Sequence, residues 1–501
     1  MAAADRRRRR TPARPGRPPR RPPRRGLLRR SLPLLAFLLV VGLVAAEVRL
    51  GVGRDWLADQ LAAPDPLTEP AQVPPPEGLT LPELATPAPV AAAGSLAAVP
   101  APARVRRALA PLLADPDLGR HVVVEVGGLT GDGPAYTAGS GLVTPASTTK
   151  LLTSIAALAA LGPDRVFTTR VVAGRGNRVV LVGGGDPFLA SRPAEDSELV
   201  YPVRADLVGL AGATATALAA EGRSRVRVAY DDSLFTGPVA SPRWEADYLP
   251  DQVVAPVSAL WVDGGRPSWG YGRVDDPASY AAQVFATALR EAGVEVTGPP
   301  TVGRSPGTAP ELAAVDSAPL AEIVEHVLDV SDNEAAEVLA HQVGLAVTGE
   351  GSFAGGRRGV ASTLAGLGVD IGDRVYDGSG LSRGSRVAVG TLLDVLRVAA
   401  SPEHPELRTV VTGLPVAGFT GSLETRFEGA GAAGRGEVRA KTGTLTGVSG
   451  LAGVVTDAGG APLVFAMVAD RVRPEPLAGL AARDALDAMA AALAACDCAR
   501  P

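Results

Sequence analysis

The chain has 501 residues, of which 46% are hydrophobic and 20% charged, so it is long enough to form at least two folded units with buried cores. Residues 1–30 hold 13 arginines and one acid, and the 36 basic and 52 acidic residues that remain give residues 31–501 a net charge of −16. This acidic body argues against nucleic acid as a partner. The two cysteines, Cys496 and Cys498, cannot build a disulfide framework or a metal site, and we interpret them as free thiols in a frayed tail.

The N-terminal part is predicted to be a targeting segment. The basic residues 1–30 directly precede an apolar run, and arginines in that place keep one end of a segment in the cytoplasm. We assign residues 31–48 as a signal peptide or a membrane anchor. The run Ser31–Ala46 is shorter than the roughly 20 residues of a spanning helix, and Val44–Ala46 offers small residues for cleavage, so both alternatives stay open. In either case the rest of the chain is expected to be extracytoplasmic.

Residues 49–104 are expected to form a linker. Pro and Ala dominate this segment from Pro64 to Pro102, which is typical of an extended spacer. The folded part then begins near Val105, with a helix to Leu113.

We divide the remainder into a catalytic domain, residues 105–165 and 308–495, and a β-rich insertion, residues 166–307. The first piece shows strand patterns and then, after Pro145, a helix that stops at Gly162. The insertion shows short β-like runs and one helix. The elements predicted from these patterns are strands at His121–Val126, Val448–Asp457 and Pro462–Asp470, and helices at Ser279–Ala292, Leu320–Leu328 and Asn333–Leu345.

Lysine occurs only twice in the chain, at Lys150 and Lys441, whereas arginine is the cationic residue at all the other Lys or Arg positions. A buried ammonium can lose its proton near neutral pH whereas guanidinium cannot, so a retained lysine suggests proton transfer or a compact charge. Lys150 follows Ser147 by three residues on the predicted helix, which places the two side chains on one face. This pair suggests a nucleophile with its base, at a helix start where free N–H groups favour negative charge.

Two further segments complete the pattern. Lys441-Thr442-Gly443-Thr444 is predicted on a strand that offers N–H groups, a hydroxyl and a positive charge to a carboxylate. Asn333, one of only two asparagines, lies in Ser331-Asp332-Asn333 at a helix start, where Ser331 or Asn333 could simply cap the helix.

The order SxxK, SxN, KTG is the signature of the penicillin-binding and serine β-lactamase families. From Val105 to Met489 the chain resembles the class C low-molecular-mass penicillin-binding proteins, the D-alanyl-D-alanine carboxypeptidases/endopeptidases. The long gap between Ser147 and Ser331 fits their inserted domains, which β-lactamases lack. Other matching segments are Gly183–Pro187, Asp231–Phe235, Tyr376–Arg383 and Gly421–Leu423.

The resemblance implies an α/β (α+β) transpeptidase/β-lactamase-like domain, with an antiparallel sheet flanked by helices and a helical lobe. It implies acyl transfer on peptidoglycan stem peptides, inhibition by β-lactams, and no metal or cofactor. In that mechanism Ser147 attacks, Lys150 takes its proton, and the N–H groups of Ser147 and Thr444 hold the oxyanion. Ser331 relays a proton and Asn333 positions Lys150. Lys441 and Thr442, followed by Gly443, bind the terminal carboxylate.

Three alternatives stay open. Gly380–Gly384 matches the GxSxG nucleophile elbow of α/β-hydrolases, but His404 is the sole histidine after Ser382 and lies between prolines. A β-lactam sensor would keep the pocket and lose turnover. A β-lactamase would need a dedicated deacylating base, and we find no separate glutamate motif for that task.

Overall fold

The computed structural model describes residues 99–499 except 132, 196–199, 269 and 306. The expected basic head, the segment 31–48 and most of the linker therefore lie outside the described residues. Among the helices in the described part, none combines the length and the apolarity that crossing a membrane requires.

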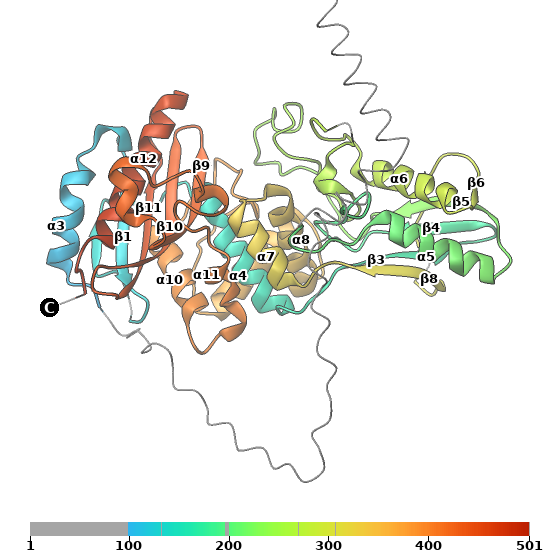
Figure 1. The fold of residues 1–501 in the computed structure, drawn as a ribbon, viewed down its shortest axis with the longest axis horizontal. Coiled ribbons are helices and arrows are strands. Elements are labelled where there is room, and N and C mark those ends of the chain that lie inside the picture. The colour runs from blue at the N-terminus through green and yellow to red at the C-terminus, as the bar shows by residue number, and fades with distance from the viewer. Residues whose placement is uncertain (1–98, 132, 196–199, 269, 306, 500–501) are drawn as a thin grey trace, which may run out of the picture. The chain divides into compact units, whose positions relative to one another are not determined.

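A five-stranded antiparallel sheet, in the order β2-β1-β11-β10-β9, forms the centre of one half of the molecule (Figure 1). Alternate residues of its middle strand enter two different hydrophobic cores, one on each face, as the period of two in a strand requires. The predicted strands are confirmed. Their bounds are β1 Val122–Gly128, β2 Tyr136–Ala138, β9 Val438–Leu445, β10 Val448–Thr456 and β11 Pro462–Ala469.

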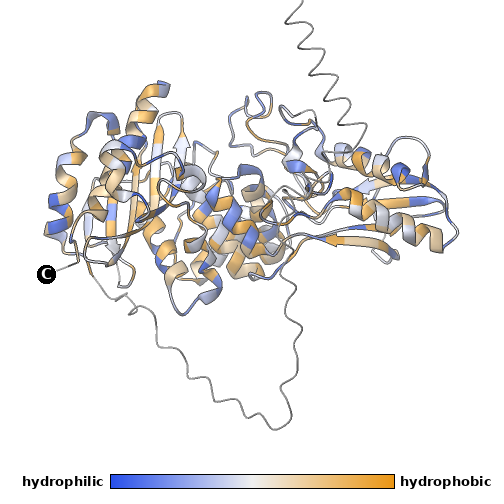
Figure 2. Ribbon diagram, in the orientation of Figure 1, coloured by the Kyte–Doolittle hydropathy of each residue, from blue (hydrophilic) through white to orange (hydrophobic). Residues whose placement is uncertain are grey.

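Helices cover both faces of this sheet. α3 (Pro102–Leu113) and α12 (Pro476–Ala494) share a core with one face, and α4 (Thr149–Leu161) and α10 (Val389–Ala400) share a core with the other. Figure 2 shows the hydrophobic strands between these helices and hydrophilic residues along α3. The sheet is thereby buried on both sides.

A helical lobe packs around α4. It contains α7 (Leu320–Asp329), α8 (Asn333–Thr348), α9 (Phe353–Gly366) and α11 (Thr409–Thr412). The predicted helices 320–328 and 333–345 are confirmed as α7 and α8. α4 and α8 lie against each other, so residues near their N-terminal ends can meet.

A second sheet of six strands is built from the middle of the chain, with both parallel and antiparallel pairs. The whole of β8 lies after the expected boundary at residue 307, yet it pairs with β3 and so belongs to this second sheet. The segment also contains a helix that the sequence pattern did not predict, α5. The elements are β3 Thr168–Ala173, β4 Arg178–Val182, α5 Leu207–Ala220, β5 Arg225–Asp231, α6 Pro277–Glu291, β6 Glu295–Val296, β7 Thr301–Val302 and β8 Glu311–Asp316.

The expectation of free thiols in a frayed tail is wrong. Cys496 and Cys498 form a disulfide, and their Cα atoms are 5.0 Å apart, within the range that a disulfide bridges. The tail is also packed, because Cys498 is fully buried and its carbonyl accepts a hydrogen bond from the N–H of Ala101 at 2.8 Å.

Candidate active site

Ser147 lies in a 3-10 turn, Ala146–Thr148, that leads directly into α4. The preceding residue, Ala146, is buried and has a φ of 47°, in the left-handed region. Such a conformation costs a non-glycine residue on the order of 1–3 kcal/mol and persists only where the surroundings impose it. The turn therefore holds Ser147 at the start of a helix, where free N–H groups favour negative charge.

Two glycines allow other segments to enclose this turn. Gly380 has a φ of +83°, and a Cβ atom on it would lie 1.8 Å from the carbonyl oxygen of Ala146. A Cβ atom on Gly443 of β9 would lie 2.8 Å from the carbonyl oxygen of Pro145. Both neighbours are backbone atoms with little freedom to move, so a side chain at either position would push its segment away from Ser147.

Lys150 is fully buried at the centre of the site. Its Nζ atom lies 3.1 Å from Ser147 Oγ, 2.7 Å from Asn333 Oδ1 and 2.8 Å from the carbonyl oxygen of Ser379. Burial lowers the pKa of Lys150 to about 8, although nearby carboxylates, Glu337 first among them, oppose this shift. A substantial fraction of neutral amine is thus present near neutral pH.

The Ser331-Asp332-Asn333 segment joins α7 to α8 beside Lys150. The cap of α8 is Asp332, whose side chain accepts a hydrogen bond from the N–H of Ala335 at 2.8 Å. The alternative interpretation, in which Ser331 or Asn333 caps the helix, is therefore wrong. Because Asp332 takes this role, the Asn333 side chain is available to Lys150. Ser331 has a φ of 64°, so the chain turns sharply there.

The Lys441-Thr442-Gly443-Thr444 segment lies on β9, as predicted. The Lys441 ammonium is fully buried and donates to the carbonyl oxygen of Thr442 at 3.2 Å. Burial holds the pKa of Lys441 well below its ordinary value, and Lys150 adds to this effect. The Thr442 hydroxyl donates to Ser422 Oγ at 3.1 Å.

These segments surround a cleft of about 270 Å³. Five of the predicted site residues line it, whereas Lys150, Lys441 and Gly443 lie behind its wall. The lining residues are Ser147, Ser331, Asn333, Ser422, Arg426, Thr442, Thr444 and Arg483.

Three lining residues were missed by the sequence argument. Ser422 belongs to a segment that matched the family pattern, but it was given no role. Arg426 makes a two-pronged ion pair with the buried Asp487, at 2.6 and 3.1 Å, and donates to the carbonyl oxygen of Arg483. These contacts join a loop to α12 across some 60 residues, and no local sequence signal could reveal them.

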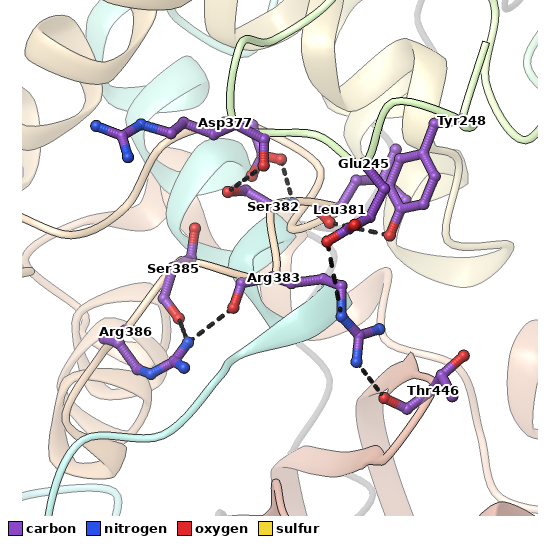
Figure 3. Close-up of polar contacts among 10 residues, drawn as sticks. Glu245, Tyr248, Asp377, Leu381, Ser382, Arg383, Ser385, Arg386 and Thr446 are labelled. Atoms are coloured by element: carbon purple, nitrogen blue, oxygen red, sulfur yellow. Dashed lines mark hydrogen bonds and ion pairs between the residues drawn. The ribbon is translucent and has the colours of Figure 1, made fainter. Parts of the chain in front are cut away.

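The alternative nucleophile, Ser382, lies in a loop outside the cleft. Its side chain is fully buried, and its hydroxyl donates to the carbonyl oxygen of Arg243 at 3.2 Å. His404 contacts Glu406 instead. In Figure 3 the backbone N–H of Ser382 contacts Asp377, while its neighbour Arg383 donates to the carbonyl of Thr446 at 2.6 Å. The elbow interpretation is not supported by this geometry.

The geometry agrees with the comparison against known families. A model described as the D-Ala-D-Ala carboxypeptidase 3 (S13) family matches residues 105–270 and 267–493. The chain belongs to this family.

Full-length relatives support the assignment of this S13 carboxypeptidase. A carboxypeptidase of Mycobacterium tuberculosis is 35% identical over 421 residues, which cover 80% of this chain and 86% of that protein. Carboxypeptidase DacB of Mycolicibacterium smegmatis is 36% identical over 436 residues, which cover 83% of this chain and 91% of that protein. The chain is therefore a serine-type D-alanyl-D-alanine carboxypeptidase, as the resemblance implied.

Solved structures confirm the predicted fold class of this S13 enzyme. The crystal structure of penicillin-binding protein 4 from Haemophilus influenzae superposes with a TM-score of 0.63 at 22% identity, and the match covers 77% of this chain and 99% of that chain. The same protein in complex with a β-lactam superposes with a TM-score of 0.56.

Proposed function

We propose that the enzyme cleaves D-Ala-D-Ala stem peptides of peptidoglycan through a covalent acyl-enzyme on Ser147, and that β-lactams acylate the same oxygen. The observation that carries this proposal is the contact of 3.1 Å between Lys150 Nζ and Ser147 Oγ at the base of the cleft. A serine hydroxyl needs a base within such reach to become a nucleophile.

The three contacts of Lys150 suit both the ammonium and the neutral amine. As an ammonium, Lys150 donates to all three oxygens. As a neutral amine it keeps its two hydrogens on the Asn333 amide oxygen and the Ser379 carbonyl oxygen, and its lone pair accepts the Ser147 hydroxyl proton. When Ser147 Oγ attacks the peptide carbonyl carbon, this proton moves to Nζ. The resulting ammonium keeps both acceptors and needs no rearrangement.

Strand β9 supplies a docking edge for the peptide. It is the last strand of its sheet, and the segment around Val416 covers its outer side only as far as Ala440. Residues 442–444 therefore face the cleft, where a substrate in extended conformation can pair with the strand. In this position the N–H groups of Thr444 and Ser147 hold the oxyanion.

The charges in the cleft fit the terminal carboxylate of the substrate. Lys441 acts from behind the strand, and the hydroxyl of Thr442 contacts the carboxylate directly. Arg483 adds a guanidinium on the α12 side. Ser331 passes the proton from Lys150 to the leaving amine as the C–N bond breaks, and water then hydrolyses the ester on Ser147.

Intact-mass spectrometry of the full chain with benzylpenicillin tests this proposal. We expect one penicilloyl adduct on the wild type and none on Ser147→Ala, with Ser382→Ala as the matched control that keeps the adduct. Release of D-Ala from a peptide ending in D-Ala-D-Ala is measured in parallel. An adduct without peptide cleavage would indicate a sensor, and an adduct that survives in Ser147→Ala would refute the nucleophile.

We also propose that residues 105–165 and 308–495 form one catalytic domain into which residues 166–307 are inserted. The membership of the two sheets supports an insertion here, but β8 (Glu311–Asp316) pairs with β3 and moves the C-terminal boundary of the insertion from residue 307 to about residue 316. Limited proteolysis checks it, because cuts should fall first in the connections next to β3 and β8.

The N-terminal segment is proposed to direct export, with residues 31–48 retained as an anchor or removed. An extracytoplasmic location follows from the substrate, since peptidoglycan lies outside the cytoplasm. The two alternatives are distinguished by measuring the intact mass of the protein isolated from the membrane fraction and from the medium of the cells that produce it.

A further inference from the structure

Two buried carboxylates, Glu337 and Asp377, lie behind the active site and have no part in the mechanism above. Glu337 is fully buried on α8 one turn after Asn333, and Asp377 is 8% exposed in the loop before Gly380. Burial of a carboxylate is costly unless the group is paired or hydrogen-bonded, so each calls for an explanation.

Glu337 is held entirely by the loop that contacts Lys150. Its two carboxylate oxygens accept backbone N–H groups, Oε2 from Gly378 at 3.1 Å and Oε1 from Ser379 at 2.8 Å. The Ser379 hydroxyl is a further donor to it. Three donors on two oxygens stabilise the ionised form of this carboxylate, because a neutral acid would have its own proton without an acceptor.

Asp377 closes the same loop from its other side. Its oxygens accept the N–H groups of Gly380 at 3.0 Å and Ser382 at 2.6 Å, and Oδ2 also accepts from the indole of Trp244 at 2.7 Å. Trp244 belongs to the segment between β5 and α6, far away in sequence. Figure 3 shows Asp377 and Ser382 at this side of the loop.

The loop also contacts α4 through its carbonyl groups. Its carbonyl oxygens point the opposite way from its N–H groups, so that Gly378 accepts from the Thr153 hydroxyl at 2.7 Å and Ser379 accepts from Lys150 Nζ at 2.8 Å. The peptide unit whose N–H donates to Glu337 gives its Gly378 carbonyl to Thr153, and the next unit, whose N–H donates to Asp377, gives its Ser379 carbonyl to Lys150. Glu337 thus fixes the loop directly beside the peptide unit that contacts the amine.

We propose that Glu337 is a positioning residue for Lys150: it holds the loop whose Ser379 carbonyl orients the amine, and it places a buried negative charge beside that amine. The inference rests on the proposed roles of Ser147 and Lys150. Through this charge Glu337 sets the pH at which the amine becomes a base, a role that a purely structural carboxylate does not have.

Other charges also face Lys150. They are Asp332 and Glu334 at the start of α8, Asp377 in the loop and Lys441 on β9. Glu334 is paired with Arg273 at 2.7 Å, which weakens its effect. Burial raises the pKa of Glu337 to about 8, and the hydrogen bonds from Ser379 and Gly378 oppose this rise. A protonated Lys150 nearby also favours the ionised carboxylate, so this ammonium and the hydrogen bonds together oppose the effect of burial.

The test is the pH dependence of acylation of the full chain by benzylpenicillin. Only neutral Lys150 accepts the Ser147 proton, so the wild-type rate rises with pH and then reaches a plateau. In Glu337→Gln the negative charge is lost, the ammonium is less stabilised, and the rise moves to lower pH by roughly one unit. Its plateau falls as well, because the amide NH₂ opposes one of the two backbone N–H groups.

Two variants separate charge from structure. Glu337→Asp keeps the charge, so its rise should stay near that of the wild type while the plateau falls. Asp457→Asn is the matched control, because Asp457 is also buried and accepts the N–H groups of Gly459, Ala461 and Ala499 at 2.8–3.0 Å, outside the site. This control should leave the rise in place.

An unshifted rise in folded Glu337→Gln would overturn the inference while leaving the proposed function intact. If Glu337→Gln fails to fold, Asp377→Asn replaces it, since loss of that charge must also move the rise to lower pH. Loss of acylation in Lys150→Ala is the separate test of the base, and full acylation in that variant would refute the proposed function itself.

Discussion

Gly443→Ala is the substitution for which the structure makes the sharpest prediction. The new Cβ atom would lie 2.8 Å from the carbonyl oxygen of Pro145 and 3.2 Å from Cγ2 of Thr148. To reach ordinary contact, β9 must move from the Ser147 turn by roughly 0.6 Å. A shift of this size separates Thr444 from Ser147, the two residues that supply the oxyanion N–H groups, and we expect acylation to slow by roughly 10- to 100-fold.

The matched control is Gly450→Ala on β10, directly opposite Gly443 in the antiparallel register. There the added Cβ atom meets no atom closer than 3.6 Å, so acylation should stay within about twofold of the wild type. The assay is the second-order rate of penicillin acylation, with thermal melting to show that each variant is folded. Equal rates for the two variants would refute the argument that close approach of β9 to the Ser147 turn requires a glycine.

Three further predictions follow from the site. Burial lowers the pKa of Lys150 to about 8, and only the neutral amine is a base. Wild-type acylation, measured by stopped flow, should therefore rise about tenfold per pH unit below that value and level off above it. A rate independent of pH from 6 to 9 would contradict this prediction. Arg483→Ala should raise KM for peptides with a free terminal carboxylate by roughly tenfold and leave KM for the C-terminal amide unchanged. Trp244→Phe removes the indole donor to Asp377 and should lower the free energy of unfolding by about 1–3 kcal/mol in denaturant titration, whereas an unchanged value would mean that this hydrogen bond does not hold the loop.

Local spacing predicted the parts of the site that lie within one element. Ser147 and Lys150 are three residues apart on a helical turn, so their contact follows from helix geometry. The strand that carries Lys441 was also predicted from its local sequence and is confirmed as β9. The alternative in which Ser331 or Asn333 caps α8 stayed open because Ser, Asp and Asn are all good caps. The structure gives this role to Asp332, and the Asn333 side chain contacts Lys150.

Longer-range features were beyond the sequence argument. The contact of Trp244 with Asp377 spans 133 residues and joins two segments with no shared pattern. Helix α5 was missed because its run of Gly, Ala and Thr has little amphipathic periodicity. Its helical structure depends instead on burial of its apolar side chains against the second sheet. The disulfide between Cys496 and Cys498 was missed because the tail was expected to be frayed, whereas it is packed against the start of α3.

The packing of the tail also determines how the domain would carry mechanical load. The N–H of Ala101 bonds to the carbonyl of Cys498, and Arg104 donates to the carbonyl of Asp497 at 3.0 Å, so the described chain enters and leaves at one corner. A pull on the polypeptide ahead of this corner acts first on α3, whose core lies on the sheet face opposite to the one that packs Ala146. We therefore expect tension to act on this helix layer before it reaches the turn that holds Ser147, because the sheet lies between them.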